Sequence, residues 1–305
     1  MKNVELERFK MDINLTEYAA VQGYTLIRHE SSRNSATMKH PKGDKIIVAK
    51  AEDQHWIYFS VRDDLDNGSI IDFVQKRQRC SLGQVRQILR TWIGGDHPRL
   101  FPKNNTMQLE PSSKDRQKVI STYGRMSEIT EHAYLEERAI GKECLLDRRF
   151  LGRIRIDERR NAVFPHYDER GLCGYEIKNK NFTGFASGGE KGLWVSNMFP
   201  EDECLVITEA TIDALSFHIL ERTKNTRYVS TAGEWNPKIP SLLQRAVNTF
   251  PGNKIILAFD NDVSGNKYEK RCRKLPLNIH QNFITLFPTA KDWNDVLINT
   301  RAFSL

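Results

Sequence analysis

The last third of the sequence repeats one pattern, in which a short apolar run is followed by a segment with apolar residues at helical spacing. The apolar runs, four to six residues long, lie at 204–208, 227–230, 254–259 and 283–287. The helical segments lie at 211–221, 241–249, 265–274 and 293–299. Strands that alternate with helices predict a parallel sheet covered by helices on both faces, with right-handed crossovers. We therefore expect an α/β domain over residues 203–305.

The first region, residues 1–95, predicts a smaller α+β domain. Its pattern indicates a helix over 15–23, strands over 45–49 and 56–60, and helices over 69–78 and 82–93. Residues 96–117 are rich in Pro, Asn, Ser and Lys and have little periodicity, which is typical of a linker.

The middle region, residues 118–202, has mixed signals. A helix is expected over 127–138, before a basic stretch at 148–155. Strands are expected over 162–165 and 173–177, joined by a turn at 168–171. We interpret this region as a small α+β segment that precedes the α/β domain.

The composition excludes several classes of protein. Of the 305 residues 39% are hydrophobic, enough for packed cores, yet no apolar run approaches the ~18–20 residues that span a bilayer. The first residues lack the apolar stretch of a signal peptide, so we expect a cytoplasmic protein without a membrane partner. The five cysteines are scattered without a CxxC pair, which supports neither a disulfide framework nor a cysteine zinc site.

The charge of the chain favours an anionic partner. Its 46 Lys and Arg against 39 Asp and Glu give a net charge of +7, and the pI is near 9.1. Phosphate contacts release counterions, so a basic chain suits nucleic acid. Many soluble proteins share this charge, and it indicates no partner by itself.

Acidic residues follow two of the expected strands. Glu209 follows the first strand, and Asp260 and Asp262 follow the third, where function collects in open α/β sheets. Carboxylate oxygens suit Mg²⁺, which can polarise a phosphoryl oxygen. Alternatively, 260–262 is a polar turn and Glu209 a first-turn acid that faces the helix dipole. Spacing alone leaves both interpretations open.

Three motifs in this region resemble those of the Toprim domain in primases and primase-helicases. They are TEATIDALS at 208–216, FDNDVSG at 259–265 and KDWNDVL at 291–297, and the resemblance covers about residues 203–298. Ala210 departs from the family, which often has glycine there. Three motifs in order, each at the matching position of the sheet, are much more specific than any one of them.

The resemblance implies a role for each matching residue. Glu209 would be a general acid/base or metal-tuning carboxylate, and Asp260 and Asp262 would be catalytic ligands of Mg²⁺ or Mn²⁺. Asp213 and Asp292 would complete the metal ligands, and Lys291 would contact phosphate. Asp213 could instead cap or pair locally, and Lys291 with Asp292 could be a solvated charge pair.

The resemblance extends upstream of the Toprim motifs. The stretches 163–175 and 190–194 resemble the segment that precedes Toprim in bacterial-type primases, and the arrangement is similar to Toprim proteins of mobile elements with a DUF3991-like middle segment. This implies that Lys178, Lys180 and Lys191 bind phosphates of template or nucleotide. Each lysine alone is more often an ordinary surface residue.

The first region resembles the zinc-binding domain of those primases over residues 59–86, but its Cys and His ligands are missing. His29, His40 and His55 are too isolated to form a four-ligand site. We therefore expect a zinc-ribbon-like α+β domain without zinc. Its core is expected to include Trp56, Phe59, Phe73 and Trp92.

The resemblance favours a primase-like, magnesium-dependent nucleotidyltransferase of the DNA-directed RNA polymerase type, which uses nucleoside triphosphates on single-stranded DNA. No GxxxxGK[ST] loop is present, so unwinding would need a separate helicase or relaxase. The alternatives are a Toprim nuclease or nicking factor of a mobile element or phage-defence system, and a non-catalytic DNA-binding accessory protein.

Overall fold

The computed structural model describes residues 4–63, 66–94, 105–111, 113–233 and 235–302. The chain forms two compact units, Met1–Lys114 and Asp115–Leu305. Among the described helices, none is both long and apolar enough to cross a membrane.

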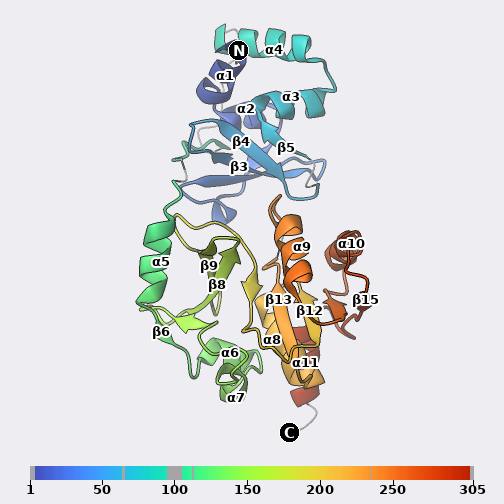
Figure 1. The fold of residues 1–305 in the computed structure, drawn as a ribbon. Coiled ribbons are helices and arrows are strands. Elements are labelled where there is room, and N and C mark those ends of the chain that lie inside the picture. Colours follow the sequence, from blue (N-terminus) through green and yellow to red (C-terminus); the bar gives the residue numbers. More distant parts are fainter. Residues whose placement is uncertain (1–3, 64–65, 95–104, 112, 234, 303–305) are drawn as a thin grey trace. The chain divides into compact units, whose positions relative to one another are not determined.

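The first unit contains an antiparallel sheet with strand order β1-β2-β3-β4-β5 (Figure 1). The strands are β1 (Thr25–Leu26), β2 (Ser35–Lys39), β3 (Lys45–Lys50), β4 (Trp56–Ser60) and β5 (Asn67–Ser69). The helices are α1 (Val4–Asp12), α2 (Leu15–Val21), α3 (Ile70–Gln78) and α4 (Leu82–Gly94), with a short 3-10 helix over Arg28–Glu30. The expected strands and helices are present, and α1, β1, β2 and β5 are additional.

Local hydrogen bonds explain where two of these helices begin. The Asn14 side chain caps α2 by accepting from the Thr16 amide at 2.9 Å. A capping box starts α3, because the Ser69 hydroxyl accepts from Ile71 while the Asp72 carboxylate accepts from the Ser69 amide at 2.7 Å.

One residue of the expected first core is exposed. Trp56 and Phe73 are buried, and the partly buried Trp92 packs against that core. Phe59, however, is 42% exposed, so its placement in the core was wrong. Side chains alternate along β4, and because Trp56 and Tyr58 point inward, Phe59 must point outward.

Part of the expected linker packs on the first unit. Leu109 is buried in its core, and the Met107 amide donates to the Thr16 hydroxyl at 3.1 Å. Residues 95–104 and 112 lie outside the described residues. The domain bounds expected from the sequence stay a prediction.

The second unit begins with an antiparallel sheet of order β10-β9-β8-β7-β6 (Figure 1). Its strands are β6 (Ser127–Glu128), β7 (Arg155–Ile156), β8 (Ala162–Asp168), β9 (Gly171–Asn179) and β10 (Phe182–Phe185). Its helices are α5 (Arg116–Gly124), α6 (Ala133–Glu137) and α7 (Lys142–Leu145). The helix expected over 127–138 was wrong, because Ser127 and Glu128 pair with β7 and only α6 is helical. Pairing with a distant strand overrides the local helical pattern.

The C-terminal sheet has the order β11-β13-β12-β14-β15. Its strands are β11 (Trp194–Val195), β12 (Cys204–Thr208), β13 (Thr226–Ser230), β14 (Lys254–Ala258) and β15 (Asn282–Thr285). Its helices are α8 (Thr211–Glu221), α9 (Ile239–Thr249), α10 (Val263–Cys272) and α11 (Trp293–Ala302). The four expected strands are parallel, which confirms the α/β fold class, and β11 adds an antiparallel edge.

The three inner strands of the sheet, β12, β13 and β14, are largely buried, and side chains pack on both faces of the sheet. One face packs into a core that also contains Phe150 and Trp194, so the middle segment and the parallel sheet share that core. The opposite face packs with α9 and α10 through residues such as Leu243 and Tyr268. This packing fixes the carboxyl ends of β12 and β14, where the candidate site lies.

Candidate metal-binding site

Glu209 lies directly after β12 and is held by the end of β13. Its backbone carbonyl accepts hydrogen bonds from the Ser230 hydroxyl at 3.0 Å and from the Gly233 amide at 2.8 Å. Its side-chain Oε2 is buried and has no hydrogen-bond partner among the described residues. The fold therefore fixes the backbone of Glu209 and leaves a carboxylate oxygen available for a ligand.

Asp260 lies at the corresponding end of β14, and its Oδ1 is likewise buried without a partner in the described part of the chain. Gly265 allows α10 to approach it closely, since a Cβ at this position would lie 2.0 Å from the Asp260 carbonyl oxygen. The next residue, Asn261, donates its amide to the Lys291 carbonyl at 2.8 Å. The second and third motifs are thus joined through their backbones.

Asp262 and Asp292 both cap helices. The Asp262 Oδ1 accepts from the Gly265 amide at 2.8 Å at the start of α10. The Asp292 Oδ1 accepts from the Asp295 amide at 2.7 Å at the start of α11. One oxygen of each carboxylate is therefore used to cap a helix, and the caps orient both acids.

The pKa values show that these acids lie close enough to act on one another. Burial, followed by the negative charges of Asp260 and Asp262, raises the pKa of Glu209 to about 7. Burial, followed by Asp292 and Asp262, raises the pKa of Asp260 to about 7. Burial and Asp260 raise the pKa of the almost fully buried Asp213 well above its ordinary value. The fold concentrates negative charge that nearby side chains do not fully compensate.

The donor set fits a hard divalent cation. Mg²⁺ takes oxygen ligands and usually keeps several waters, so one or two carboxylates suffice. The Glu209 and Asp260 oxygens that no described residue bonds to are such ligands. No group of three His, Cys, Asp or Glu side chains within the described ranges is arranged to hold a metal ion. Among the described residues the acids therefore act on one another through their charges without forming a three-ligand metal site.

The third motif has a structural role that the sequence analysis missed. Asn294 is buried, and its amide donates to the Asp213 carboxylate at 3.3 Å. Its side-chain nitrogen donates to the Ser216 hydroxyl at 3.0 Å and to the Arg138 carbonyl at 2.8 Å. Trp293 donates from its ring nitrogen to the Ala258 carbonyl at 3.1 Å. The presence of Asn294 inside the motif at 291–297 was the sequence signal from which this structural role could have been inferred.

The four lysines expected to bind phosphate separate into two groups. Lys191 and Lys291 lie near Glu209, since their positive charges counteract the rise of its pKa. Lys178 pairs with Glu176 at 3.2 Å, and Lys180 pairs with Glu137 at 2.7 Å. The structure therefore brings Lys191 and Lys291 to the acids, whereas Lys178 and Lys180 pair with acids outside this cluster.

A parallel α/β sheet with coupled acids at its carboxyl ends is the class of fold that the three motifs predicted. Residues 206–297 match the family described as Toprim-like, and residues 133–202 match the family described as a protein of unknown function (DUF3991). The chain thus carries a Toprim-like domain that follows a DUF3991 segment, which confirms the resemblance of these two regions; the resemblance of residues 59–86 to a zinc-binding domain stays a prediction.

The chain is also similar to three solved primase structures, each at low identity. For the primase fragment of the bacteriophage T7 primase-helicase protein, identity is 18%, coverage is 66% of this chain and 80% of that chain, and the TM-score is 0.45. For the RNA polymerase domain of Mycobacterium tuberculosis primase DnaG, identity is 15%, coverage is 58% of this chain and 67% of that chain, and the TM-score is 0.28. A chain in a structure of the bacteriophage T7 lagging-strand DNA polymerase interacting with primase domains, bound to an RNA/DNA hybrid and dTTP, has 18% identity, covers 58% of this chain and 87% of that chain, and has a TM-score of 0.43. No curated protein matches this chain.

Proposed function

We propose that this protein is a primase-like nucleotidyltransferase that uses Mg²⁺ or Mn²⁺ to join nucleotides on single-stranded DNA. One observation carries the proposal: Glu209 and Asp260 each keep a buried oxygen that has no hydrogen-bond partner among the described residues, within a cluster of mutually repelling acids. Holding these acids near one another without a cation costs free energy, and a cluster of this kind is a strong candidate for a functional site.

The chain's own residues would divide the work among them. Asp260 and Asp262, with Asp213 and Asp292 beside them, would hold the metal, which when bound polarises a phosphoryl oxygen. Glu209 would accept or return a proton at the attacking hydroxyl, because its raised pKa suits general acid/base work near neutral pH.

Lysines at the edge of the cluster would position the substrate. Lys191 and Lys291 would contact phosphate groups and favour the negatively charged substrate. Positioning and charge stabilisation are the main tasks of a protein in phosphoryl transfer. Lys178 and Lys180 would contribute less, because each already pairs with a glutamate.

The middle segment supports synthesis over simple cleavage. It shares a core with the Toprim-like sheet, and it supplies Lys191 to the neighbourhood of Glu209. A nuclease built on the acids alone would not need a second segment at its site. We infer a role in replication or transfer of a mobile element, with a separate helicase or relaxase that opens the duplex.

The direct test incubates purified protein with labelled single-stranded DNA, Mg²⁺ and nucleoside triphosphates. We expect new products whose amount grows with nucleotide concentration and is strongly reduced when Asp260→Asn replaces the wild type. Shortened DNA without any extension product would favour the nuclease. Binding without either product, equal in wild type and variant, would favour the accessory protein.

A further inference from the structure

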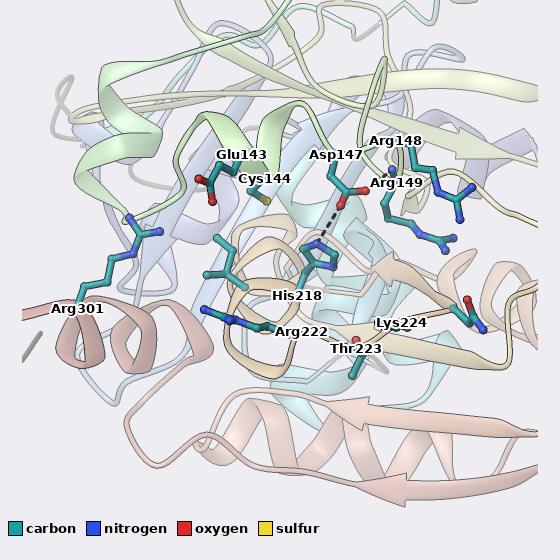
Figure 2. Close-up of a pocket in the computed structure, with 12 residues that line it drawn as sticks. Glu143, Cys144, Asp147, Arg148, Arg149, His218, Arg222, Thr223, Lys224 and Arg301 are labelled. Atoms are coloured by element: carbon teal, nitrogen blue, oxygen red, sulfur yellow. Dashed lines mark hydrogen bonds and ion pairs between the residues drawn. The ribbon is translucent and has the colours of Figure 1, made fainter.

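A second charged site lies at the opposite end of the C-terminal sheet from the acids. It is a cavity of about 670 Å³ lined by α7 and the turn after it, the end of α8 with the turn into β13, and Arg301 near the end of α11 (Figure 2). The turn before β13 is at the amino end of the parallel strands, whereas Glu209 and Asp260 follow their carboxyl ends. The cavity is therefore separate from the acidic cluster.

Two of the five Arg and Lys side chains that line the cavity are occupied elsewhere. Both terminal nitrogens of Arg149 bond to Asp202, at 2.9 and 2.6 Å. Arg148 pairs with Glu201 at 2.5 Å. Figure 2 shows the head groups of Arg148 and Arg149 turned to the same side, away from Arg222 and Arg301. The basic stretch at 148–155 thus has a partly structural role, and its Arg148 and Arg149 are not available to bind a ligand in the cavity.

The other three cations are exposed and have no partner within the described ranges. Arg222, Lys224 and Arg301 make no side-chain ion pair or hydrogen bond to any described residue. Arg222 and Lys224 lie in the turn between α8 and β13, and Arg301 lies in α11. The lining also holds two acids, Glu143 and Asp147. Asp147 already accepts the Arg149 amide at 2.7 Å and lies 3.5 Å from His218 Nε2. Positive charge therefore exceeds the negative charge that is free to oppose it.

The inner wall of the cavity is polar and ordered. His218 Nδ1 lies 3.1 Å from the Tyr228 hydroxyl, which lies 2.8 Å from the Thr223 hydroxyl. Burial lowers the pKa of His218, so this wall carries a neutral imidazole at pH 7. Neutral polar groups behind a set of exposed cations can orient a ligand without adding charge.

We propose that this cavity binds the phosphate groups of a nucleotide, as a site distinct from the acidic cluster. Its volume falls within the roughly 300–1,000 Å³ that small-molecule sites occupy. Arg222 and Arg301 offer planar guanidinium groups that match phosphate oxygens in pairs, and Lys224 adds a point charge. The phosphate can belong to a free nucleotide or to a nucleotide unit of a strand, and the chemistry that recognises it is the same.

The test compares two charge-matched double variants of the full chain in EDTA, so that no metal-bridged binding contributes. The first is Arg222→Asn with Lys224→Ser, because asparagine tolerates the left-handed backbone of Arg222 at φ 46°. The control is Arg245→Asn with Lys270→Ser, which removes two exposed cations outside the cavity. Calorimetry measures binding of ATP and of inorganic tripolyphosphate, and fluorescence anisotropy measures binding of a labelled oligothymidylate.

We expect the cavity variant to weaken binding of ATP and tripolyphosphate by about tenfold or more, and the control by less than about twofold. A loss confined to the oligothymidylate would support the same site with a strand as the source of the phosphates. Equal losses in both variants, or no loss in either, would overturn the proposal. Arg301→Ser changes a residue on a different helix and should weaken binding in the same direction. If the double variant unfolds, unchanged binding in Arg301→Ser overturns the proposal.

Discussion

The two units each contain a cluster of charged residues, and the clusters differ in how completely their polar atoms are bonded. In the first unit, Arg77 donates to Asp66 at 2.7 Å, to Asp44 at 2.9 Å and to the Tyr24 hydroxyl at 3.1 Å. The Tyr58 hydroxyl donates to Asp66 at 2.5 Å. Burial raises the pKa of Asp66, but the bonds from Arg77 and Tyr58 outweigh it and hold the pKa below its ordinary value.

The acidic cluster of the second unit is the opposite case. Glu209 and Asp260 each keep a buried oxygen without a hydrogen-bond partner in the described part of the chain, and their pKa values rise to about 7. A buried network whose polar atoms are all hydrogen-bonded stabilises the fold. A buried cluster with unbonded charged atoms destabilises it, and a bound ligand can remove that cost. The comparison teaches that the bonding state of charges, more than their number, separates a structural cluster from a functional one.

The largest effect is expected from Asp260→Asn. It should reduce metal-dependent activity roughly 10²–10³-fold, because one stabilising group at the reacting phosphoryl centre is lost. Asp262→Asn should have a similar effect while it keeps the cap of α10, since asparagine also caps helices. Wild-type turnover in either variant, with Mg²⁺ binding unchanged by calorimetry, would show that Asp260 and Asp262 do not hold the metal.

The same Asp260→Asn variant should unfold at a higher temperature than the wild type when both are metal-free at pH 8. The folded pKa of Asp260, about 7, exceeds the ordinary value of 3.8, so its ionisation destabilises the folded wild type as the pH rises through 7. We expect a rise in Tm of roughly 2–4 °C by calorimetry. A lower Tm for the variant would mean that the cluster stabilises the fold after all.

Arg77→Met tests the completed cluster. It would leave Asp44 and Asp66 partly buried without their cation and should lower the free energy of unfolding by about 2–3 kcal/mol, less than for a fully buried pair. Arg77→Lys, which keeps a charge but not the planar fork, is the matched control and should lose less. Denaturant unfolding measures both. Equal stability of wild type and Arg77→Met would show that bonding in this cluster contributes nothing to the fold.

His166 provides an intermediate case, a buried group with one bonded and one unbonded nitrogen. Its Nδ1 accepts from the Gly192 amide at 3.3 Å, and its Nε2 has no partner among the described residues. Burial, then Lys191 and Lys178, lowers its pKa to about 3. The unfolded chain takes up a proton below pH 6.5 and the folded chain does not, so stability falls as the pH decreases from 6.5 towards 3.

Between pH 7 and pH 5, wild type should therefore lose about 2 kcal/mol more than His166→Gln, a variant that cannot take up this proton. Denaturant unfolding at the two pH values gives the difference. Parallel losses in the two proteins would show that His166 is not held neutral by the fold.

The smallest effect is expected from Lys180→Ser. Its pair with Glu137 is exposed on both sides, at 66% and 51%, so its loss should change the free energy of unfolding by no more than about 0.5 kcal/mol. Binding of labelled single-stranded DNA should change less than it does in Lys191→Ser, whose lysine acts on Glu209. A larger loss in Lys180→Ser would place the template on the hairpin of β9 and β10 instead.

The sequence by itself predicted the part of the molecule whose signals are local. Each strand of the parallel sheet is a continuous apolar run, and Glu209 and Asp260 follow two of these runs directly. Parallel strands place their carboxyl ends at one edge, so order along the chain implies proximity in space. This is why the α/β fold and the gathering of these acids could be inferred before any coordinates.

The tertiary structure alone decided features that depend on residues distant in sequence. Ser127 pairs with Ile156 instead of starting a helix, and Phe59 faces outward because the register of β4 places Trp56 and Tyr58 inside. Arg149 pairs with Asp202, which is 53 residues away in the sequence, and Lys180 pairs with Glu137, which is 43 residues away. A sequence shows which charges and apolar groups exist, but the partner of each is chosen by packing. Whether a charge stabilises the fold or remains available to a ligand is therefore settled only when the chain has folded.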